Sequence, residues 1–197
     1  MQVLDPLKRL RILDVAAERF AAQPFHKVLL SDVAGAAGVG KGTLYTYFKS
    51  KDDLYLSVLY NGFCQLIDQL HQKVDQNQQS PLENLETVVH EIVRFACQNP
   101  YLYELMRAVP WNQVTDNALW SSKRSELRNL IEAIIRRGIT QGELADPHPE
   151  LTARFIPHLV RSVMMDRELS LNPETLSAHI LRFTSAALAP KQQDRME

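Results

Sequence analysis

Cysteine is scarce in this sequence, with only Cys64 and Cys97 among 197 residues. The two cysteines are isolated and form no close pairing motif, so we expect small buried apolar residues, with a redox switch as the less favoured alternative. Long apolar runs are also missing, because no stretch of about 18 apolar residues occurs and no apolar segment opens the chain. We therefore expect a cytoplasmic protein that is neither secreted nor embedded in a membrane.

The six histidines and the serines show no arrangement that is typical of catalysis or metal binding. No two histidines have the His-x-x-x-His spacing, no cysteine stands at ligand spacing, and no serine lies in a nucleophile elbow. The sequence therefore predicts no enzyme activity, no bound metal and no cofactor.

A strong net charge is absent as well, but the near-neutral total of −1 conceals an asymmetry. Residues 1–55 carry eight Lys and Arg against six Asp and Glu, a net of +2, which leaves −3 for the remainder. Lys8, Arg9 and Arg11 lie at the start of the first predicted helix. Lys41, Lys49 and Lys51 flank the short helix that is predicted after Gly40. Both clusters are suited to attract phosphate.

Apolar residues recur at helical spacing along nearly the whole chain, and their content of 45% suffices for one substantial core and a small satellite domain. Leu10, Leu13, Ala17 and Phe20 predict a first helix with its apolar stripe in the core. Ser50 and Asp53 form a capping-box-like start for a long helix, and Ser80 with Pro81 and Glu83 starts another. The predicted helices span residues 7–22, 51–77, 81–98, 100–107, 115–140, 149–167 and 173–188, with two short helices before and after a turn at Gly38.

These patterns predict an all-α fold with two domains and a polar tail. A three-helix head occupies residues 1–50, a helical bundle residues 51–190, and the tail residues 191–197. The helix that begins near residue 51 is long enough, at 1.5 Å per residue, to connect the head with the bundle.

The stretch from Ser31 to Lys51 has the form of a helix-turn-helix. Ser31 is suited to cap a short helix, and Gly38 to form the left-handed turn after it. Val39 and Leu44 are spaced to fill the angle between the two helices. The side chains left to point outward include hydroxyls and cations, which read base edges and hold phosphates. They are Lys41, Thr43, Thr46, Tyr47 and Lys49.

The same stretch also comes close to a phosphate-binding P-loop, because Gly35 is followed after four residues by Gly40 and Lys41. A P-loop needs a Ser or Thr directly after the lysine, where this chain has Gly42, and it needs a preceding strand. Residues 28–30 are too short for a central strand. A nucleotide-binding enzyme is therefore a remote alternative.

Several short runs resemble the N-terminal signature of the tetracycline-repressor (TetR) family of bacterial transcriptional regulators. They are Ser31-Asp-Val-Ala, Gly38-Val39, Gly40-Lys41-Gly42-Thr43-Leu44-Tyr45, Tyr47-Phe48 and Lys51-Asp-Asp-Leu54. The resemblance covers about residues 8–60, and a weaker one covers residues 136–144. One departure is Gly40, where the family often has a serine that caps the helix and touches phosphate.

The resemblance implies a DNA-binding repressor that binds an inverted-repeat operator as a homodimer and is released by a small-molecule effector. It also implies that Tyr45 and Lys51 contact phosphate, in addition to the outward-pointing side chains named above. The expected DNA-binding residues are then Lys41, Thr43, Tyr45, Thr46, Tyr47, Lys49 and Lys51.

The helices at 149–167 and 173–188 are apolar over a wide arc, so each must be covered by more than one neighbour. In the family the last two helices form a four-helix dimer interface; central helices of a monomer are the alternative. The expected interface residues are Phe155, Leu159, Val163, Ile180, Phe183 and Ala187. Pro157 removes one helical hydrogen bond and should kink its helix.

The resemblance also implies a pocket for the effector inside the bundle. Its candidate lining residues are aromatic, aliphatic or Met side chains and one histidine, the likeliest polar group. They are Phe63, Ile67, His90, Tyr101, Tyr103, Met106, Trp111, Trp120 and Met165. The alternative is that a partner protein docks on the second domain, with Tyr101, Trp111 or Trp120 as exposed anchors.

Overall fold

The structure is a computed structural model that describes residues 4–76, 79–99, 118–166 and 172–190. Within these ranges every regular element is a helix, which confirms the all-α prediction. The predicted helix at 100–107, the loop after it and the tail at 191–197 lie outside the described residues. The chain divides into two compact units, Met1–Phe63 and Cys64–Glu197. The predicted boundary at residues 50 and 51 marks the start of helix α4, whereas the units divide inside that helix.

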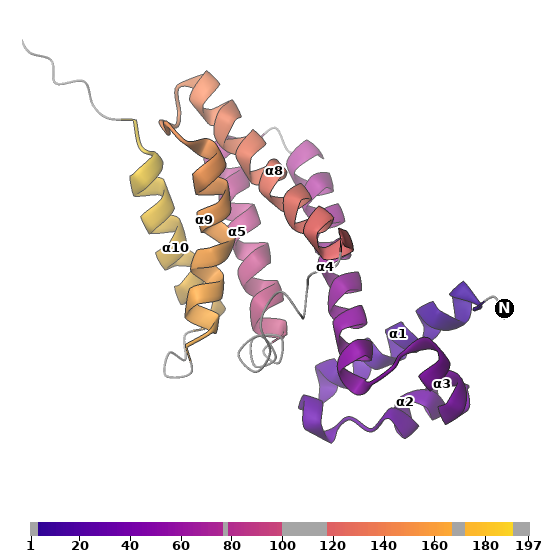
Figure 1. Ribbon diagram of the computed structural model, residues 1–197. Coiled ribbons are helices and arrows are strands. Elements are labelled where there is room, and N and C mark those ends of the chain that lie inside the picture. Colours follow the sequence, from indigo (N-terminus) through magenta and orange to yellow (C-terminus); the bar gives the residue numbers. More distant parts are fainter. Residues whose placement is uncertain (1–3, 77–78, 100–117, 167–171, 191–197) are drawn as a thin grey trace, which may run out of the picture. The chain divides into compact units, whose positions relative to one another are not determined.

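The first unit, the head, begins with α1 (Pro6–Ala22), whose N-cap Asp5 accepts hydrogen bonds from the backbone N–H groups of Leu7 and Lys8. It continues through the short turn η1 (Phe25–Lys27), α2 (Leu30–Ala36) and α3 (Lys41–Tyr47) into the first part of α4 (Lys51–Gln76) (Figure 1). One apolar cluster holds these elements together. Its buried members are Ile12, Leu13, Ala16, Val28, Val33, Ala34, Ala37, Leu44, Phe48 and Leu54.

Two local predictions for the head are wrong. Leu10 is exposed because the buried stripe of α1 runs through Ile12, Leu13 and Ala16 instead. Ser31 does not cap α2, which begins one residue earlier with Leu29 at the N-cap position. Its hydroxyl instead donates to the Asp32 carboxylate at 3.2 Å.

The second unit, the helical unit, contains the rest of α4 and four further described helices: α5 (Pro81–Gln98), α8 (Ala118–Gln141), α9 (Pro149–Met164) and α10 (Pro173–Leu188). Helix α5 packs against α8, α9 and α10, and Figure 1 shows it among them. This position explains its apolar face, because Leu85, Val88, Val89, Ile92 and Val93 are all buried.

Two predicted helix ends in this unit are confirmed, whereas α9 ends at Met164, three residues before the predicted end. Ser80 and Glu83 form a reciprocal capping box at the start of α5, with Pro81 at the first helical position. Gly142 ends α8 with a φ of 75°, the left-handed conformation that glycine adopts without strain. Directly after it, the Ala145 N–H donates to the Leu188 carbonyl at 2.8 Å, which ties the turn after α8 to the end of α10.

Candidate functional site

The helix-turn-helix has the predicted turn. Gly38 has a φ of 65°, and the N–H of Val39 donates to the carbonyl of Ala34 at 2.9 Å, so the chain reverses directly after α2. Leu44 is fully buried and Val39 packs partly buried against the same cluster. These two residues set the angle between α2 and α3, as the spacing predicted.

Helix α3 begins without a side-chain cap. Gly40 stands at the N-cap position with φ −70° and ψ 151°, and its carbonyl accepts from the Leu44 N–H at 3.1 Å. This backbone conformation is open to any residue. A Cβ at position 40 would lie 3.9 Å from Thr43 Oγ1, an ordinary contact, so the site also has room for the serine that the sequence lacks.

The outward face of α3 is formed by exposed hydroxyls and cations. Lys41, Tyr45 and Thr46 of α3 are exposed, as is Lys49, two residues after the helix ends, and Tyr45 retains 46% of its surface. The Thr46 hydroxyl donates to the Gly42 carbonyl at 3.0 Å, which leaves its oxygen available as an acceptor. This face therefore offers two ammonium groups, a phenol and a threonine to a ligand outside the head.

Tyr47 is placed differently from these four residues. Its ring is half-buried against the head core, and its hydroxyl accepts a hydrogen bond from the Asp5 N–H at 3.1 Å. This bond joins the last residue of α3 to the N-cap of α1. Thr43, one turn before Tyr47, is also half-buried.

Lys51 lies at the start of α4 and turns back toward η1. Its Nζ donates to the His26 carbonyl at 3.3 Å and lies 4.5 Å from the centroid of the Phe25 ring. Burial lowers the pKa of this ammonium below its ordinary value, against the opposing charge of Asp52. Lys51 thus helps to anchor η1 on α4.

The start of α4 has the predicted cap at Ser50, but one of its two hydrogen bonds has a different partner. The Asp53 N–H donates to Ser50 Oγ at 3.1 Å, but the Asp53 carboxylate accepts from the N–H of Lys49 rather than that of Ser50. The bond of 2.7 Å fixes the backbone of Lys49 at the end of the outward face.

Sequence reasoning missed several contacts that orient the head. The rings of Phe20, Phe25 and Tyr55 form a cluster with centroid distances of 4.9 to 5.6 Å. The Arg9 guanidinium lies 5.3 Å from the centroid of the buried Phe48 ring. Helical spacing does not signal the contacts of Tyr55 with Phe20 and Phe25 or of Arg9 with Phe48, because these residues are distant in sequence.

The predicted effector residues do not form one described pocket. Ile67 and Trp120 are buried, whereas Phe63 and Met165 are half-buried. His90 was predicted as the polar group of the pocket, but it is exposed, because α5 buries the opposite face. Buried Trp120 is also unsuited as an exposed anchor for a partner protein. The other four candidates, Tyr101, Tyr103, Met106 and Trp111, lie outside the described residues.

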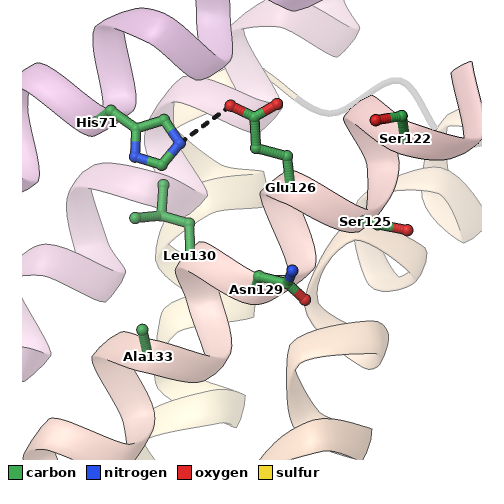
Figure 2. A pocket seen from close by; sticks show the side chains of 7 residues that line it. All are labelled: His71, Ser122, Ser125, Glu126, Asn129, Leu130 and Ala133. Carbon is green, nitrogen blue, oxygen red and sulfur yellow. Dashed lines mark ion pairs between the residues drawn. The ribbon is translucent and has the colours of Figure 1, made fainter. Parts of the chain in front are cut away.

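A groove that the sequence did not predict lies in the helical unit and has a volume of about 460 Å³. Six of its lining residues follow one face of α8, and the seventh, His71, comes from α4, as Figure 2 shows. The lining residues are His71, Ser122, Ser125, Glu126, Asn129, Leu130 and Ala133. The signal that was available is the helical spacing of the polar residues Ser122, Ser125, Glu126 and Asn129.

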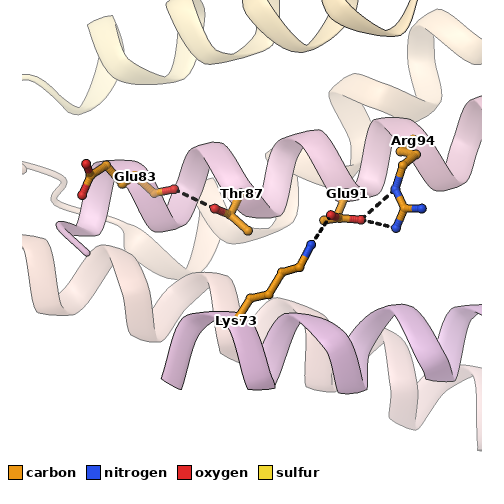
Figure 3. A network of polar contacts seen from close by, with 5 residues as sticks. All are labelled: Lys73, Glu83, Thr87, Glu91 and Arg94. Atoms are coloured by element: carbon orange, nitrogen blue, oxygen red, sulfur yellow. Dashed lines mark hydrogen bonds and ion pairs between the residues drawn. The ribbon is translucent and has the colours of Figure 1, made fainter. Parts of the chain in front are cut away.

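A second polar contact region joins α4 to α5 in the same unit (Figure 3). The Glu91 carboxylate accepts from Lys73 of α4 and from Arg94 of its own helix. Burial would raise the pKa of Glu91, but the hydrogen bonds from Lys73 and Arg94 outweigh it and hold the pKa below the ordinary value of 4.5. The carboxylate is therefore ionised at neutral pH and links the two helices.

The outer faces of α9 and α10 carry large apolar side chains. Phe155 is 59% exposed and Phe183 is 62% exposed, while Ala187 is exposed and Leu159 and Val163 are half-buried. Ile180 is only 4% exposed and packs inside the unit, so it cannot add contact area to a dimer and is removed from the predicted interface. Pro157 lies inside α9, as expected.

A membrane-spanning helix and a metal-binding cluster are both absent from the part of the chain that the structure describes. None of its helices combines the length and apolar character that a membrane crossing requires. It also contains no group of three or more His, Cys, Asp or Glu side chains placed to hold a metal ion. Residues 35–41 form the end of α2, the turn and the first residue of α3, and no strand precedes them, so the P-loop alternative is not supported.

Residues 12–58 match the family described as "Bacterial regulatory proteins, tetR family", and residues 78–165 match the "Tetracyclin repressor-like, C-terminal domain". The chain belongs to the tetR family. It is thus a DNA-binding transcriptional regulator, and the α2–turn–α3 segment is its helix-turn-helix.

Relatives of this tetR-family chain match over most of its length. It is 28% identical over 174 residues to the HTH-type transcriptional regulator YhgD of Bacillus subtilis, covering 84% of this chain and 88% of YhgD. A crystal structure of FadR from Bacillus subtilis in complex with stearoyl-CoA has a TM-score of 0.68 at 21% identity, covering 90% and 97%. A regulator from Saccharomonospora viridis in complex with choline has a TM-score of 0.71 at 19% identity, covering 95% and 100%. At these identities the two structures establish the shared fold.

Proposed function

We propose that the protein is a repressor that binds an inverted-repeat operator as a homodimer and releases it when a small molecule occupies the helical unit. The observation that carries the DNA-binding part is the outward face of α3, where Lys41, Tyr45, Thr46 and Lys49 are exposed together. A helix of this kind enters the major groove, where hydroxyls contact base edges and ammonium groups contact phosphate.

The other predicted DNA contacts have second roles in the head. Tyr47 and Lys51 hold Asp5 and η1 respectively, so their first contribution is to the shape of the head. Thr43 is half-buried beside the exposed face. In this proposal Lys41, Tyr45, Thr46 and Lys49 carry most of the direct contact, and Thr43, Tyr47 and Lys51 border it.

Dimerisation follows from the exposed phenyl rings of α9 and α10. Phe155 and Phe183 would leave water if the same face of a second copy covered them, and a two-fold axis makes such a contact self-complementary. The interface residues in this proposal are Phe155, Leu159, Val163, Phe183 and Ala187. Two heads related by this axis bind two half-sites, which is why we propose an inverted repeat.

Release by a small molecule is supported by the similar structures, which are complexes with stearoyl-CoA and with choline. Such a ligand must prefer the form of the protein that does not bind DNA, because equal affinity for both forms shifts no population.

Alanine variants of the outward face test the DNA-binding part on a duplex selected from a random pool. We expect Lys41→Ala and Tyr45→Ala each to weaken binding about tenfold or more, and Lys41→Ala also to lower the salt dependence by about one counterion. His90→Ala, an exposed residue on α5, is the control and should bind like the unmodified protein. Unchanged affinity in both α3 variants would refute this assignment.

A further inference from the structure

The groove on α8 combines an apolar floor with a carboxylate. Leu130 and Ala133 supply apolar surface, and Glu126 is the only charged side chain among the seven that line it. Its volume of about 460 Å³ lies within the range of about 300–1,000 Å³ that is typical of small-molecule sites. A ligand that fills it must therefore be partly apolar and compatible with a negative charge.

The two oxygens of Glu126 are held by donors of unequal strength. Lys123 Nζ lies 2.8 Å from Oε2, whereas His71 Nε2 lies 3.2 Å from Oε1. The bond from the ammonium is charge-assisted and short, and the longer bond from the imidazole is the weaker of the two. The contact with Lys123 also lowers the pKa of Glu126, so the carboxylate is ionised at neutral pH. The bond from His71 is thus the one that a competing donor replaces.

The surrounding charges favour a cation at this end of the groove. Asp68 of α4 acts electrostatically on Lys123, so two carboxylates share one ammonium there. Arg128 lies beside the groove as well, but its guanidinium donates to the lining hydroxyl of Ser125 at 2.6 Å. An anionic ligand at Glu126 would face a carboxylate that is already ionised, whereas an ammonium ion can donate to Oε1 in place of His71.

We infer that this groove binds a small alkylammonium ion, which places its N–H groups on Glu126 Oε1, displaces His71, and lays its alkyl chain over Leu130 and Ala133. His71 is the only lining residue on α4, so this bond is a link between α4 and α8. Helix α4 also supplies residues to the head unit. Occupancy of the groove therefore breaks a link on the helix that continues into the DNA-binding unit. This regulatory part rests on the proposed function, whereas ammonium binding does not.

Isothermal titration without DNA tests the binding site directly. The probes are n-butylammonium, n-hexylammonium and n-octylammonium, and the carboxylates of equal length serve as controls. We expect only the ammonium ions to bind, more tightly with longer chains as more apolar surface is covered. Glu126→Gln, which keeps the shape of the side chain and removes its charge, should weaken binding about tenfold or more. Glu132→Gln is the matched control, because it removes an equivalent charge from α8 outside the groove.

His71→Ala distinguishes displacement from a purely structural role. Because the imidazole competes for Glu126, its removal should tighten hexylammonium binding about threefold, whereas loss of a supporting side chain would weaken it. The imidazole resonances of His71 in the unmodified protein should also shift when hexylammonium is added, a readout that requires no variant. Equal binding of carboxylates, unchanged affinity in Glu126→Gln, or no binding of any ammonium ion would overturn the inference.

Operator affinity measured with and without hexylammonium tests the regulatory part separately. We expect weaker operator binding when the groove is filled, and no such response in His71→Ala. If ammonium binds as described but operator affinity does not change, the link through α4 is refuted and the binding site stands. If no operator exists, the proposed function fails while the titration result remains valid.

Discussion

Helix α3 and the pair α9–α10 expose opposite kinds of side chain. On the surface of the head, α3 exposes lysine, tyrosine and threonine side chains. The last two helices expose Phe155 and Phe183. The polar face suits a charged, hydrated polymer such as DNA, and the apolar face suits another protein surface. The contrast supports the proposal that one unit binds nucleic acid and the other a second copy of the chain.

The largest expected effect comes from placing a charge on the apolar face. Phe155→Glu should raise the dimer dissociation constant about 150- to 5,000-fold, because burial of an unpaired carboxylate costs about 3–5 kcal/mol. Sedimentation velocity measures the change. Leu119→Glu, another exposed apolar side chain but on α8, should leave the dimer intact. Dissociation by Leu119→Glu, or a stable dimer of Phe155→Glu, would place the interface elsewhere.

Substitution of Tyr47 tests whether the packing of α3 stabilises the head. Tyr47→Ala should lower the free energy of unfolding by about 2 kcal/mol, because a half-buried ring leaves the core. Tyr47→Phe should cost only about 1 kcal/mol, since it removes just the hydrogen bond from Asp5. Urea denaturation followed by circular dichroism gives both values. Equal losses in the two variants would contradict the packing role of the ring.

Glu91 tests the link between α4 and α5 in the helical unit. Because its pKa is lower in the folded than in the unfolded protein, its stabilising contribution is complete well above pH 4.5 and is lost as the pH falls through the folded value. Glu91→Gln should therefore reduce stability by about 1 kcal/mol at pH 7 and by less near pH 3. Denaturation at both pH values checks this, and a loss that does not depend on pH would exclude the ionised carboxylate as its source.

Two glycines of the helix-turn-helix should respond to alanine in opposite directions. Gly38→Ala should destabilise the head by about 1 kcal/mol, because its φ of 65° is unfavourable for any residue with a Cβ. Gly42→Ala should stabilise α3 by about 0.5 kcal/mol, since Gly42 has ordinary helical geometry and nothing lies within 4 Å of an added Cβ. Thermal denaturation of the two variants tests the sign of each effect.

The smallest expected effect concerns the missing cap of α3. Gly40→Ser should stabilise the head by a few tenths of a kcal/mol, because the serine hydroxyl can accept an N–H bond at the start of the helix. The same hydroxyl should strengthen operator binding, which a gel-shift titration measures. Weaker binding in this variant would mean that the exposed backbone of Gly40 is itself needed at the DNA.

The sequence predicted most of the head because the signals there are local. Gly38, Val39 and Leu44 act within a few residues of one another, and their spacing alone implied the turn and its packing. The bond from Asp5 to Tyr47 was missed because it joins residues 42 positions apart. Side chains that look outward by helical spacing can thus be held by a distant part of the chain.

Prediction was poorer in the helical unit, although its helices were placed well. His90 was predicted to line a pocket but is exposed, and Ile180 was predicted to lie in an interface but is buried inside the unit. Helical spacing shows which residues share a face of a helix, but not what covers that face. The groove at Glu126 was missed for the same reason, since it needs His71 from a second helix. Helix boundaries follow from local capping, whereas sites between helices follow from packing.

Selection of bound duplexes from a random pool, with the mass of the purified protein determined in solution alongside, tests the central claim most directly. The account predicts enrichment of an inverted repeat that is bound by a dimer. Enrichment of a single unrepeated site by a monomer, or no enrichment by folded protein at low salt, would contradict it.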